Sequence, residues 1–147
     1  MTRVTFDQVN LGDSLPPLRR YITQDIIDQN AVASLDYNPV HINAEWCRAA
    51  RVLFPDYFTD SPVGHGMMTM SFMASAVAEW AYPRGWITLM ECKFIRPVYP
   101  GDTITCGGIV TEKHPLGKGR DFVVLELFAD NQKAVRVAES TARVLLP

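Results

Sequence analysis

The feature that most constrains the fold of this chain is an apolar segment near its middle. Residues 66–81 carry four methionines among small Ala and Ser side chains, and apolar positions recur around nearly the whole circumference of a helix drawn through them. A helix without a polar face has to be buried on most of its sides. We therefore expect the rest of the chain to wrap around a helix at 66–81.

Four extended stretches follow this segment and predict a sheet. They span residues 86–96, 103–112, 120–129 and 134–145. The connections at 97–102, 115–119 and 130–133 are short enough to join antiparallel neighbours. Gly107 and Gly108 indicate a bulge or a sharp bend inside the second stretch. The economical solution is an α+β domain in which a bent antiparallel sheet is wrapped around the central helix.

The N-terminal part of the chain predicts a strand followed by a helix. Residues 19–22 are expected to form a short strand, and Thr23 is expected to cap a helix along which apolar side chains recur every four residues, namely Ile27, Ala31 and Leu35. Pro39 disfavours the helical conformation for Asn38. The helix is therefore expected to end at 36–38.

Residues 43–64 predict a second short helix and then a loop. Asn43 is expected to cap a helix that runs to Ala50. The stretch 51–64 mixes aromatic residues with Pro and Gly, which suits an ordered loop better than a helix.

Length and charge restrict the class of protein. A chain of 147 residues with 48% hydrophobic and 20% charged residues is expected to form one domain over residues 1–147 without help from metal or disulfides. A net charge of -2 gives no cationic field to attract nucleic acid or an anionic membrane. The absence of a leader-like or membrane-spanning run predicts a cytoplasmic protein. Three widely spaced cysteines indicate neither a disulfide framework nor a zinc knuckle.

The first motif that could carry chemistry contains Asp36, Asn38, Pro39 and His41. Asp and Asn before Pro commonly form a turn, and a single His after it is often a packed or surface residue. The functional interpretation is that a rigid Asn-Pro turn directs a carboxylate and an imidazole into one pocket, where both can transfer protons near neutral pH.

The second motif is Gly64, His65, Gly66 and Met67, at the start of the apolar helix. Free amides at a helix N-terminus, with glycines that allow close approach, can stabilise a carbonyl oxygen that gains negative charge. The structural alternative is a glycine-rich helix start with a capping His. The third motif, residues 94–102, indicates by itself only a strand that ends in a tight turn.

Together these motifs resemble a known family, the MaoC-like (R)-specific enoyl-CoA hydratases and dehydratases of the hotdog fold. The run Asp36-Tyr37-Asn38-Pro39-Val40-His41 matches the hydratase signature, followed by the His65-Gly66-Met67 helix start and the Phe94 to Asp102 strand and turn. The resemblance covers residues from about 5 to 146. It implies a hotdog fold and the addition of water to a trans-2-enoyl-CoA thioester, or the reverse dehydration.

The resemblance also implies residue roles. Asp36 and His41 would bind and activate the water and transfer protons, and the amides of Gly66 and Met67 would polarise the thioester carbonyl. No metal or other cofactor is expected, because coenzyme A enters as part of the substrate. Its phosphates require cations, for which the sequence offers Lys93, Arg96 and Arg143 without selecting among them.

Two departures from the family pattern concern the turn and the acyl group. Leu35 stands where the family usually has Gly, before Asp36. The stretch between His41 and His65 is several residues longer than usual in the family, and its apolar residues are expected to shape the acyl pocket. The expected pocket residues are Asn38, Phe54, Tyr57, Phe58 and His65. A branched or dicarboxylic acyl group stays open as an alternative substrate.

Two other functions, a thioesterase and a non-catalytic subunit, are alternatives to a hydratase. A hotdog thioesterase needs a carboxylate on or facing the central helix, and Glu79, near its C-terminal end, is the candidate there. A non-catalytic subunit of a heteromeric hydratase is expected to lack Asp36 or His41, and this chain has both. The open sheet edges predict a homodimer.

Overall fold

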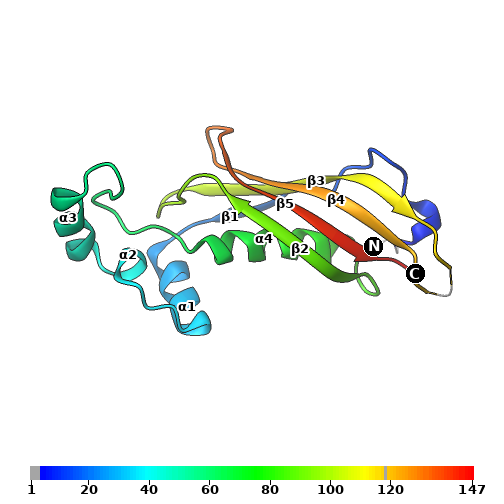
Figure 1. Ribbon diagram of the computed structural model, residues 1–147, viewed down its shortest axis with the longest axis horizontal. Helices are drawn as coiled ribbons and strands as arrows, with labels where there is room; N and C mark the ends of the chain where they lie inside the picture. The colour runs from blue at the N-terminus through cyan, green and yellow to red at the C-terminus, as the bar shows by residue number, and fades with distance from the viewer. Residues whose placement is uncertain (1–3, 118) are drawn as a thin grey trace.

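The computed structural model describes residues 4–117 and 119–147. Within these ranges five strands form one antiparallel sheet in the order β1-β3-β4-β5-β2, and helix α4 (Gly66–Trp80) lies along one face of it (Figure 1). The strands are β1 (Leu18–Tyr21), β2 (Trp86–Phe94), β3 (Thr103–His114), β4 (Phe122–Asp130) and β5 (Arg136–Leu145). The α+β architecture expected from the sequence is confirmed.

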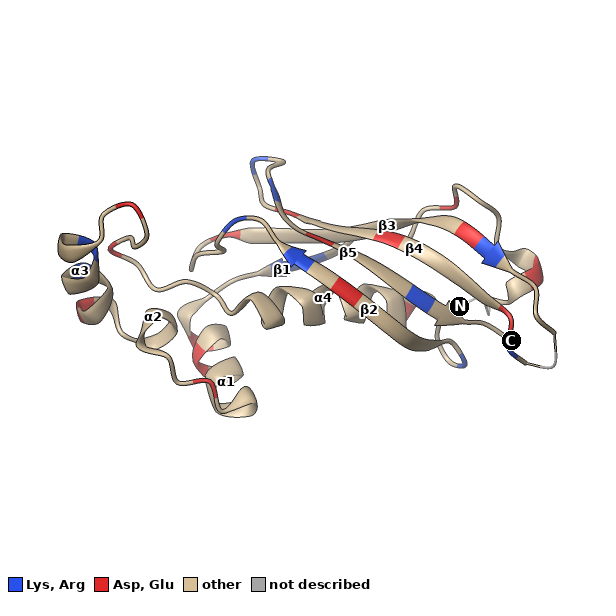
Figure 2. Cartoon of the chain, viewed as in Figure 1, with Lys and Arg blue, Asp and Glu red and all other residues tan. Residues whose placement is uncertain are grey.

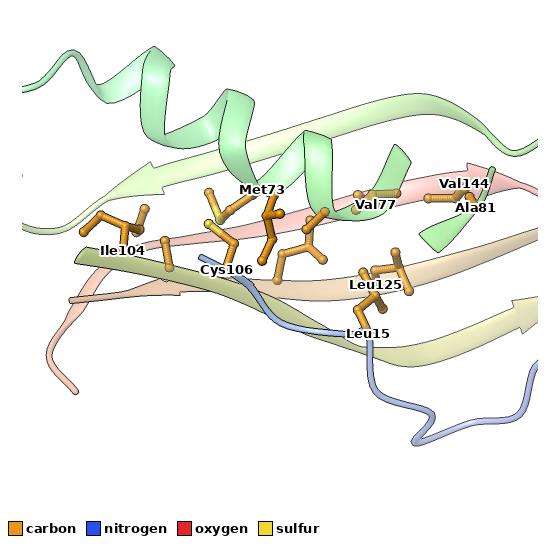
Figure 3. Close-up of a cluster of buried hydrophobic side chains, with 14 of the residues drawn as sticks. Leu15, Met73, Val77, Ala81, Ile104, Cys106, Leu125 and Val144 are labelled. Carbon is orange, nitrogen blue, oxygen red and sulfur yellow. The ribbon is translucent and has the colours of Figure 1, made fainter. Parts of the chain in front are cut away.

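Helix α4 buries only the side that faces the sheet. Met73 and Val77 on this side are fully buried and lie against Cys106 and Leu125 of the strands (Figure 3). On the other side the Met67 side chain is 61% exposed. The expectation of a helix buried on most sides is therefore wrong for the part of the chain that the structure describes, because the sheet covers one face of α4 and residues such as Met67 on the other face stay exposed.

The connection after β2 is not a hairpin. β2 pairs with β5 at the edge of the sheet, whereas β3 lies three positions away. The intervening segment 95–102 instead docks on the domain, where Val98 is buried and its carbonyl accepts a hydrogen bond from the Gly64 amide at 2.7 Å. The expectation that this short connection joins antiparallel neighbours is wrong, while the β3 to β4 and β4 to β5 hairpins are confirmed.

The irregularity of β3 does not lie at its paired glycines. Gly107 and Gly108 stay in register with β4, and the register shifts between Val110 and Glu112. The glycines instead make room for neighbouring side chains, because a Cβ on Gly107 would lie 2.7 Å from Cζ of Phe128. The predicted position of the bulge is therefore wrong by about three residues, and close packing explains the glycines.

The remaining helices gather at one end of the molecule (Figure 1). They are α1 (Gln24–Ser34), α2 (Pro39–Ile42) and α3 (Ala44–Leu53). The short 3-10 helix Phe6–Gln8 lies at the opposite end of the molecule (Figure 1). The Thr23 hydroxyl accepts a hydrogen bond from the amide of Ile26, and the Asn43 side chain accepts one from Trp46, so both predicted N-caps are confirmed. The short helix α2 was not predicted. Helix α3 continues to Leu53, so residues 51–53 are helical although they were predicted to belong to the 51–64 loop.

Leu35 does not continue the buried stripe of α1. It follows the last helical residue, has a φ of 59° and is 76% exposed. Helix α1 therefore ends at Ser34, before the predicted end at 36–38, and Leu35 does not extend the apolar face that contains Ile27 and Ala31. Its backbone adopts the left-handed conformation that favours glycine, and this is the position where the resembled family usually has one.

The charged side chains and the cysteines form no distinct cluster among the described residues. Lysines and arginines are interspersed with acidic residues rather than collected in one patch (Figure 2). Within the described ranges, the helices are too short or too polar to span a membrane. The three cysteines are unpaired, and burial raises the pKa of the Cys106 thiol to about 12.

Candidate active site

The turn between α1 and α2 presents the first motif. The Asn38 side chain caps α2 by accepting a hydrogen bond from the Val40 amide at 3.2 Å, and Pro39 is the first residue of that helix. The Asp36 carboxylate accepts a hydrogen bond from the Asn38 amide at 3.3 Å. Asn38 therefore has a structural role in the turn, and the turn places Asp36 and His41 on the same side.

The carboxylate of Asp36 and the imidazole of His41 approach one another. Asp36 Oδ2 lies 3.7 Å from His41 Nε2. His41 Nδ1 donates a hydrogen bond to the carbonyl of Val63 at 2.7 Å, which directs the other ring nitrogen towards the carboxylate. The Asp36 side chain is 51% exposed and that of His41 is 14% exposed, so the pair is accessible from the carboxylate side.

His65 joins this pair, although the sequence suggested only a pocket or packing role. Its side chain is 3% exposed, and its Nε2 lies 3.1 Å from the backbone carbonyl of Asp36 and 3.9 Å from Asp36 Oδ2. Its ring stacks on His41 with centroids 3.7 Å apart and an interplanar angle of 24°. Because His65 lies 29 residues after Asp36 in the sequence, only the fold shows that its side chain contacts the pair.

The same three side chains have to be considered as metal ligands. One donor atom from each of Asp36, His41 and His65 lies within 4.8 Å of the others. A metal ion lies in the plane of each imidazole that binds it, at about 2.0–2.1 Å from the nitrogen. Two rings stacked face to face cannot share an ion in this way without rotating, and such a rotation would break the hydrogen bond from His65 to Asp36. The geometry therefore favours proton transfer over metal binding.

The start of α4 lies next to the pair, and a cleft opens beside it. Gly66 is the first residue of α4, and the amides of the first turn of a helix have no partner within the helix. A Cβ on Gly66 would lie 3.0 Å from the Phe94 ring, so the glycine lets this ring pack closely against the start of α4. The cleft has a volume of about 380 Å³, and its lining includes Val63, Gly66, Thr69, Phe94, Arg96 and Val98.

The three aromatic residues predicted to shape the acyl pocket lie in the segment that follows α3. Phe58 packs edge-on against Trp46 of α3 with ring centroids 5.4 Å apart, and Phe54 lies 6.3 Å from Phe58. Tyr57 is 84% exposed. None of the three is among the residues that line the cleft beside Gly66.

The structure separates the three cations proposed for coenzyme A. Lys93 lines a groove of about 670 Å³ on the face of the sheet away from α4, where it pairs with Glu139 at 3.6 Å. Arg143 lies over the Phe122 ring, 4.7 Å from its centroid. Only Arg96 among the three lines the cleft beside Gly66. The larger groove does not contain the paired Asp and His residues, and we do not place the site there.

Comparison with protein families decides the classification. The family model of the MaoC like domain matches residues 9–131. The chain belongs to this family. The MaoC-like assignment made from the three motifs is thereby confirmed.

Solved structures similar to this MaoC-like chain include two (R)-hydratases. The unliganded R-hydratase PhaJ1 of Pseudomonas aeruginosa shares 25% identity at a TM-score of 0.84, over 99% of this chain and 86% of that one. The (R)-hydratase of A. caviae, involved in PHA biosynthesis, shares 22% identity at a TM-score of 0.79, over 95% and 98%. These matches confirm the predicted hotdog fold.

A third similar structure comes from a heteromeric assembly. The ChsH1-ChsH2 complex of Mycobacterium tuberculosis contains a chain with 20% identity and a TM-score of 0.79, over 95% of this chain and 100% of that one. At this identity the similarity concerns the fold alone. No match is found among curated proteins.

Proposed function

We propose that this MaoC-like protein is a hydro-lyase that adds water across the 2,3 double bond of trans-2-enoyl-CoA thioesters to give (R)-3-hydroxyacyl-CoA, or catalyses the reverse dehydration. The observation that carries the proposal is the 3.7 Å approach of Asp36 Oδ2 to His41 Nε2, next to the N-terminus of α4. Hydration requires a base for water, an acid for C2 and stabilisation of the charge on the thioester oxygen. A carboxylate, an imidazole and helix amides meet these three needs.

Asp36 and His41 act on the water together. The water oxygen forms a bond to C3 while one of its protons passes to the pair, and C2 receives a proton from the pair. Because the two groups face one reacting oxygen, we assign the proton transfers to the pair rather than to either residue alone. In the dehydration direction the same steps run in reverse.

The first turn of α4 serves the thioester. Its amides at Gly66 and Met67 donate to the carbonyl oxygen as it gains negative charge. The Phe94 ring lies against Gly66, so a side chain at this position would require the ring to shift. The cleft beside Gly66 receives part of the substrate, and Arg96 at its wall is the cation we assign to the coenzyme A moiety. We propose no further cofactor.

The acyl group is the least determined part of the substrate. The pocket role proposed for Asn38 is indirect, because its side chain caps α2. The roles of Phe54, Tyr57 and Phe58 in acyl selection remain a prediction. The branched and dicarboxylic acyl groups are therefore tested beside linear chains in the assay below.

A thioesterase is disfavoured by the position of Glu79. This residue lies 13 positions beyond Gly66 on α4, which corresponds to about 20 Å along a helix. Its carboxylate is exposed and lies 3.5 Å from the Arg20 guanidinium. It is too remote from the first turn of α4 to act on a carbonyl there.

The proposed assembly is a homodimer formed at the edge of the sheet. β2 is the last strand on its side, and it exposes Trp86 and Leu89. An exposed edge with apolar side chains is a ready site for pairing with a second strand. The alternative is a heteromeric hydratase in which this chain, having both Asp36 and His41, supplies the active residues.

The decisive experiment is a panel of trans-2-enoyl-CoA thioesters with short, long, branched and carboxylated acyl groups. We expect loss of the ultraviolet absorption of the conjugated thioester for at least one member, with formation of the R product. An S product, or no turnover of any member, would refute the proposed reaction. Release of free thiol without hydration would instead indicate a thioesterase.

A further inference from the structure

We propose that His65 is a positioning residue that fixes both members of the catalytic pair, one through its ring and the other through its Nε2. This inference rests on the proposed function of Asp36 and His41. It goes beyond that proposal because it gives the third side chain of the cluster a task that requires no contact with the substrate.

A hydrogen bond connects His65 to the turn that carries Asp36. A carbonyl oxygen can only accept, so the 3.1 Å contact makes His65 Nε2 the donor and the Asp36 carbonyl the acceptor. The other hydrogen bonds of residues 35–38 are local. Among the residues that the structure describes, this bond alone ties the 35–38 turn to the start of α4.

The two imidazole rings are stacked. The His65 ring covers one face of His41 at 3.7 Å between centroids. The edge of His41 is held by the bond from its Nδ1 to the Val63 carbonyl, and the Val63 amide donates to the Val40 carbonyl at 3.1 Å. Stacking on His65 therefore limits the tilt of the His41 ring. The hydrogen bond to the Val63 carbonyl limits the rotation of the ring in its own plane.

The His65 side chain is buried. A side chain that is 3% exposed is not free to reach a substrate in the cleft, and His65 does not line it. Its Nδ1 is buried and has no hydrogen-bond partner among the described residues. Leaving a buried nitrogen unpaired costs free energy. The His65 side chain stacks its ring on His41 and donates a hydrogen bond from Nε2 to the Asp36 carbonyl. Substitution of His65 by an aliphatic residue would remove both contacts at once.

Two substitutions separate these contributions. His65→Phe keeps an aromatic face for His41 and removes the donor to Asp36, whereas His65→Gln keeps an amide donor and removes the ring. Since a displacement of about 1 Å in a catalytic group can cost about 10²-fold in rate, we expect His65→Phe to lower kcat by about 10- to 100-fold with little change in KM. His65→Gln should retain more activity than His65→Phe if its amide reaches the Asp36 carbonyl.

A matched control tests for a general effect of lost stability. The Ser140 hydroxyl is buried in the sheet and donates to the Glu91 carbonyl at 2.6 Å. Ser140→Ala removes a buried hydrogen bond of the same kind at a distance from the pair and should lower Tm without lowering kcat. A folded His65→Phe or His65→Gln variant with parental kcat would overturn the proposal. So would a rise in KM at constant kcat, which would mean contact with the substrate.

A proton NMR measurement tests the positioning without any assay. Ring protons of His41 that lie over the His65 ring are shifted upfield, so His65→Gln should move them downfield while His65→Phe should not. If the parent protein hydrates none of the thioesters, the proposed function fails and this spectrum still decides the role of His65. Unchanged His41 signals in a folded His65→Gln variant would refute it.

Discussion

The carboxylate oxygen Oδ2 of Asp36 lies 3.7 Å from Nε2 of His41, which is longer than a hydrogen bond. Such separations are common in catalytic groups before the substrate binds, and they tighten in the complex. A water molecule or a hydroxyl group that bridges the two atoms would contact both groups at once. The open distance therefore suits a pair that shares a reacting oxygen rather than an ion pair that is closed on itself.

The pair itself gives the first prediction. Asp36→Asn and His41→Ala should leave a folded protein and lower kcat by about 10²–10⁴-fold, because general acid and base catalysis typically contributes that much. Residues that act as a unit lose their effects non-additively, so the double variant should be little slower than the slower single variant. Steady-state kinetics measure this, and an Asp36→Asn variant with nearly parental kcat would make Asp36 a turn former only.

The second prediction concerns Leu35, whose backbone is left-handed, before the turn that carries Asp36. A side chain in this conformation costs about 1–2 kcal/mol, and the greater freedom of unfolded glycine offsets about 0.5–1 kcal/mol. Because Leu35 is 76% exposed, Leu35→Gly should raise the free energy of unfolding by about 0.5–1 kcal/mol. Urea denaturation measures this. Ala33→Gly, inside α1, is the control and should lower it by about 1 kcal/mol.

The third prediction tests the sheet edge. Sedimentation of the parent protein should show a species of twice the 16.5 kDa chain mass. Leu89→Lys places a charge on the exposed edge strand β2 and should shift the population towards monomer. Leu11→Lys, at an exposed residue outside the strands, is the matched control and should not. A parent protein that sediments only as a monomer at micromolar concentration would contradict the homodimer.

The fourth prediction concerns acyl selection. If the segment between α3 and α4 shapes the acyl pocket, Phe54→Ala and Phe58→Ala should change the ranking of linear, branched and carboxylated substrates. Val52→Ala, at an 83% exposed position of α3, is the control and should preserve the ranking. The kcat/KM values across the panel measure this. An unchanged ranking in both variants would agree with the exposed position of Phe54 and assign selection to the cleft beside Gly66.

The fifth prediction follows from the Cys106 thiol. Burial raises its pKa from 9.0 to about 12, so above pH 9 the thiol ionises in the unfolded chain while it stays protonated in the folded one. The unfolded state then binds fewer protons, and stability falls as pH rises between 9 and about 12. Relative to a Cys106→Val variant, the parent should lose unfolding free energy over this range, as denaturation at several pH values would show. Parallel losses would contradict this.

Local signals in the sequence were sufficient for the helix starts. Thr23 and Asn43 act within three residues of themselves, so their caps follow from nearest neighbours alone. The end of α1 was harder, because Leu35 fits the apolar spacing of the helix and its left-handed backbone depends on the turn that follows. The glycine usual at this position in the family was the signal that could have found it.

The order of the strands and contacts between distant residues could not be predicted from local sequence patterns. The 97–102 connection has the length of a hairpin loop, and only the burial of Val98 and the pairing of β2 with β5 distinguish it from one. Asp36 and His41 were found because they lie in one short motif. The contact of His65 with Asp36 spans 29 residues, and nothing in the sequence near either residue indicates it.

The bonds that join residues 36–41 directly to residues 63–65 have a consequence for how such a protein can change. The intervening chain leaves this junction at His41 and returns to it at Val63, so its length is not set by the geometry of the acid and base. Insertions and deletions at 54–62 are therefore open to selection or to engineering while the junction is left intact. Variation in the length of this segment is thereby uncoupled from the contacts among Asp36, His41 and His65.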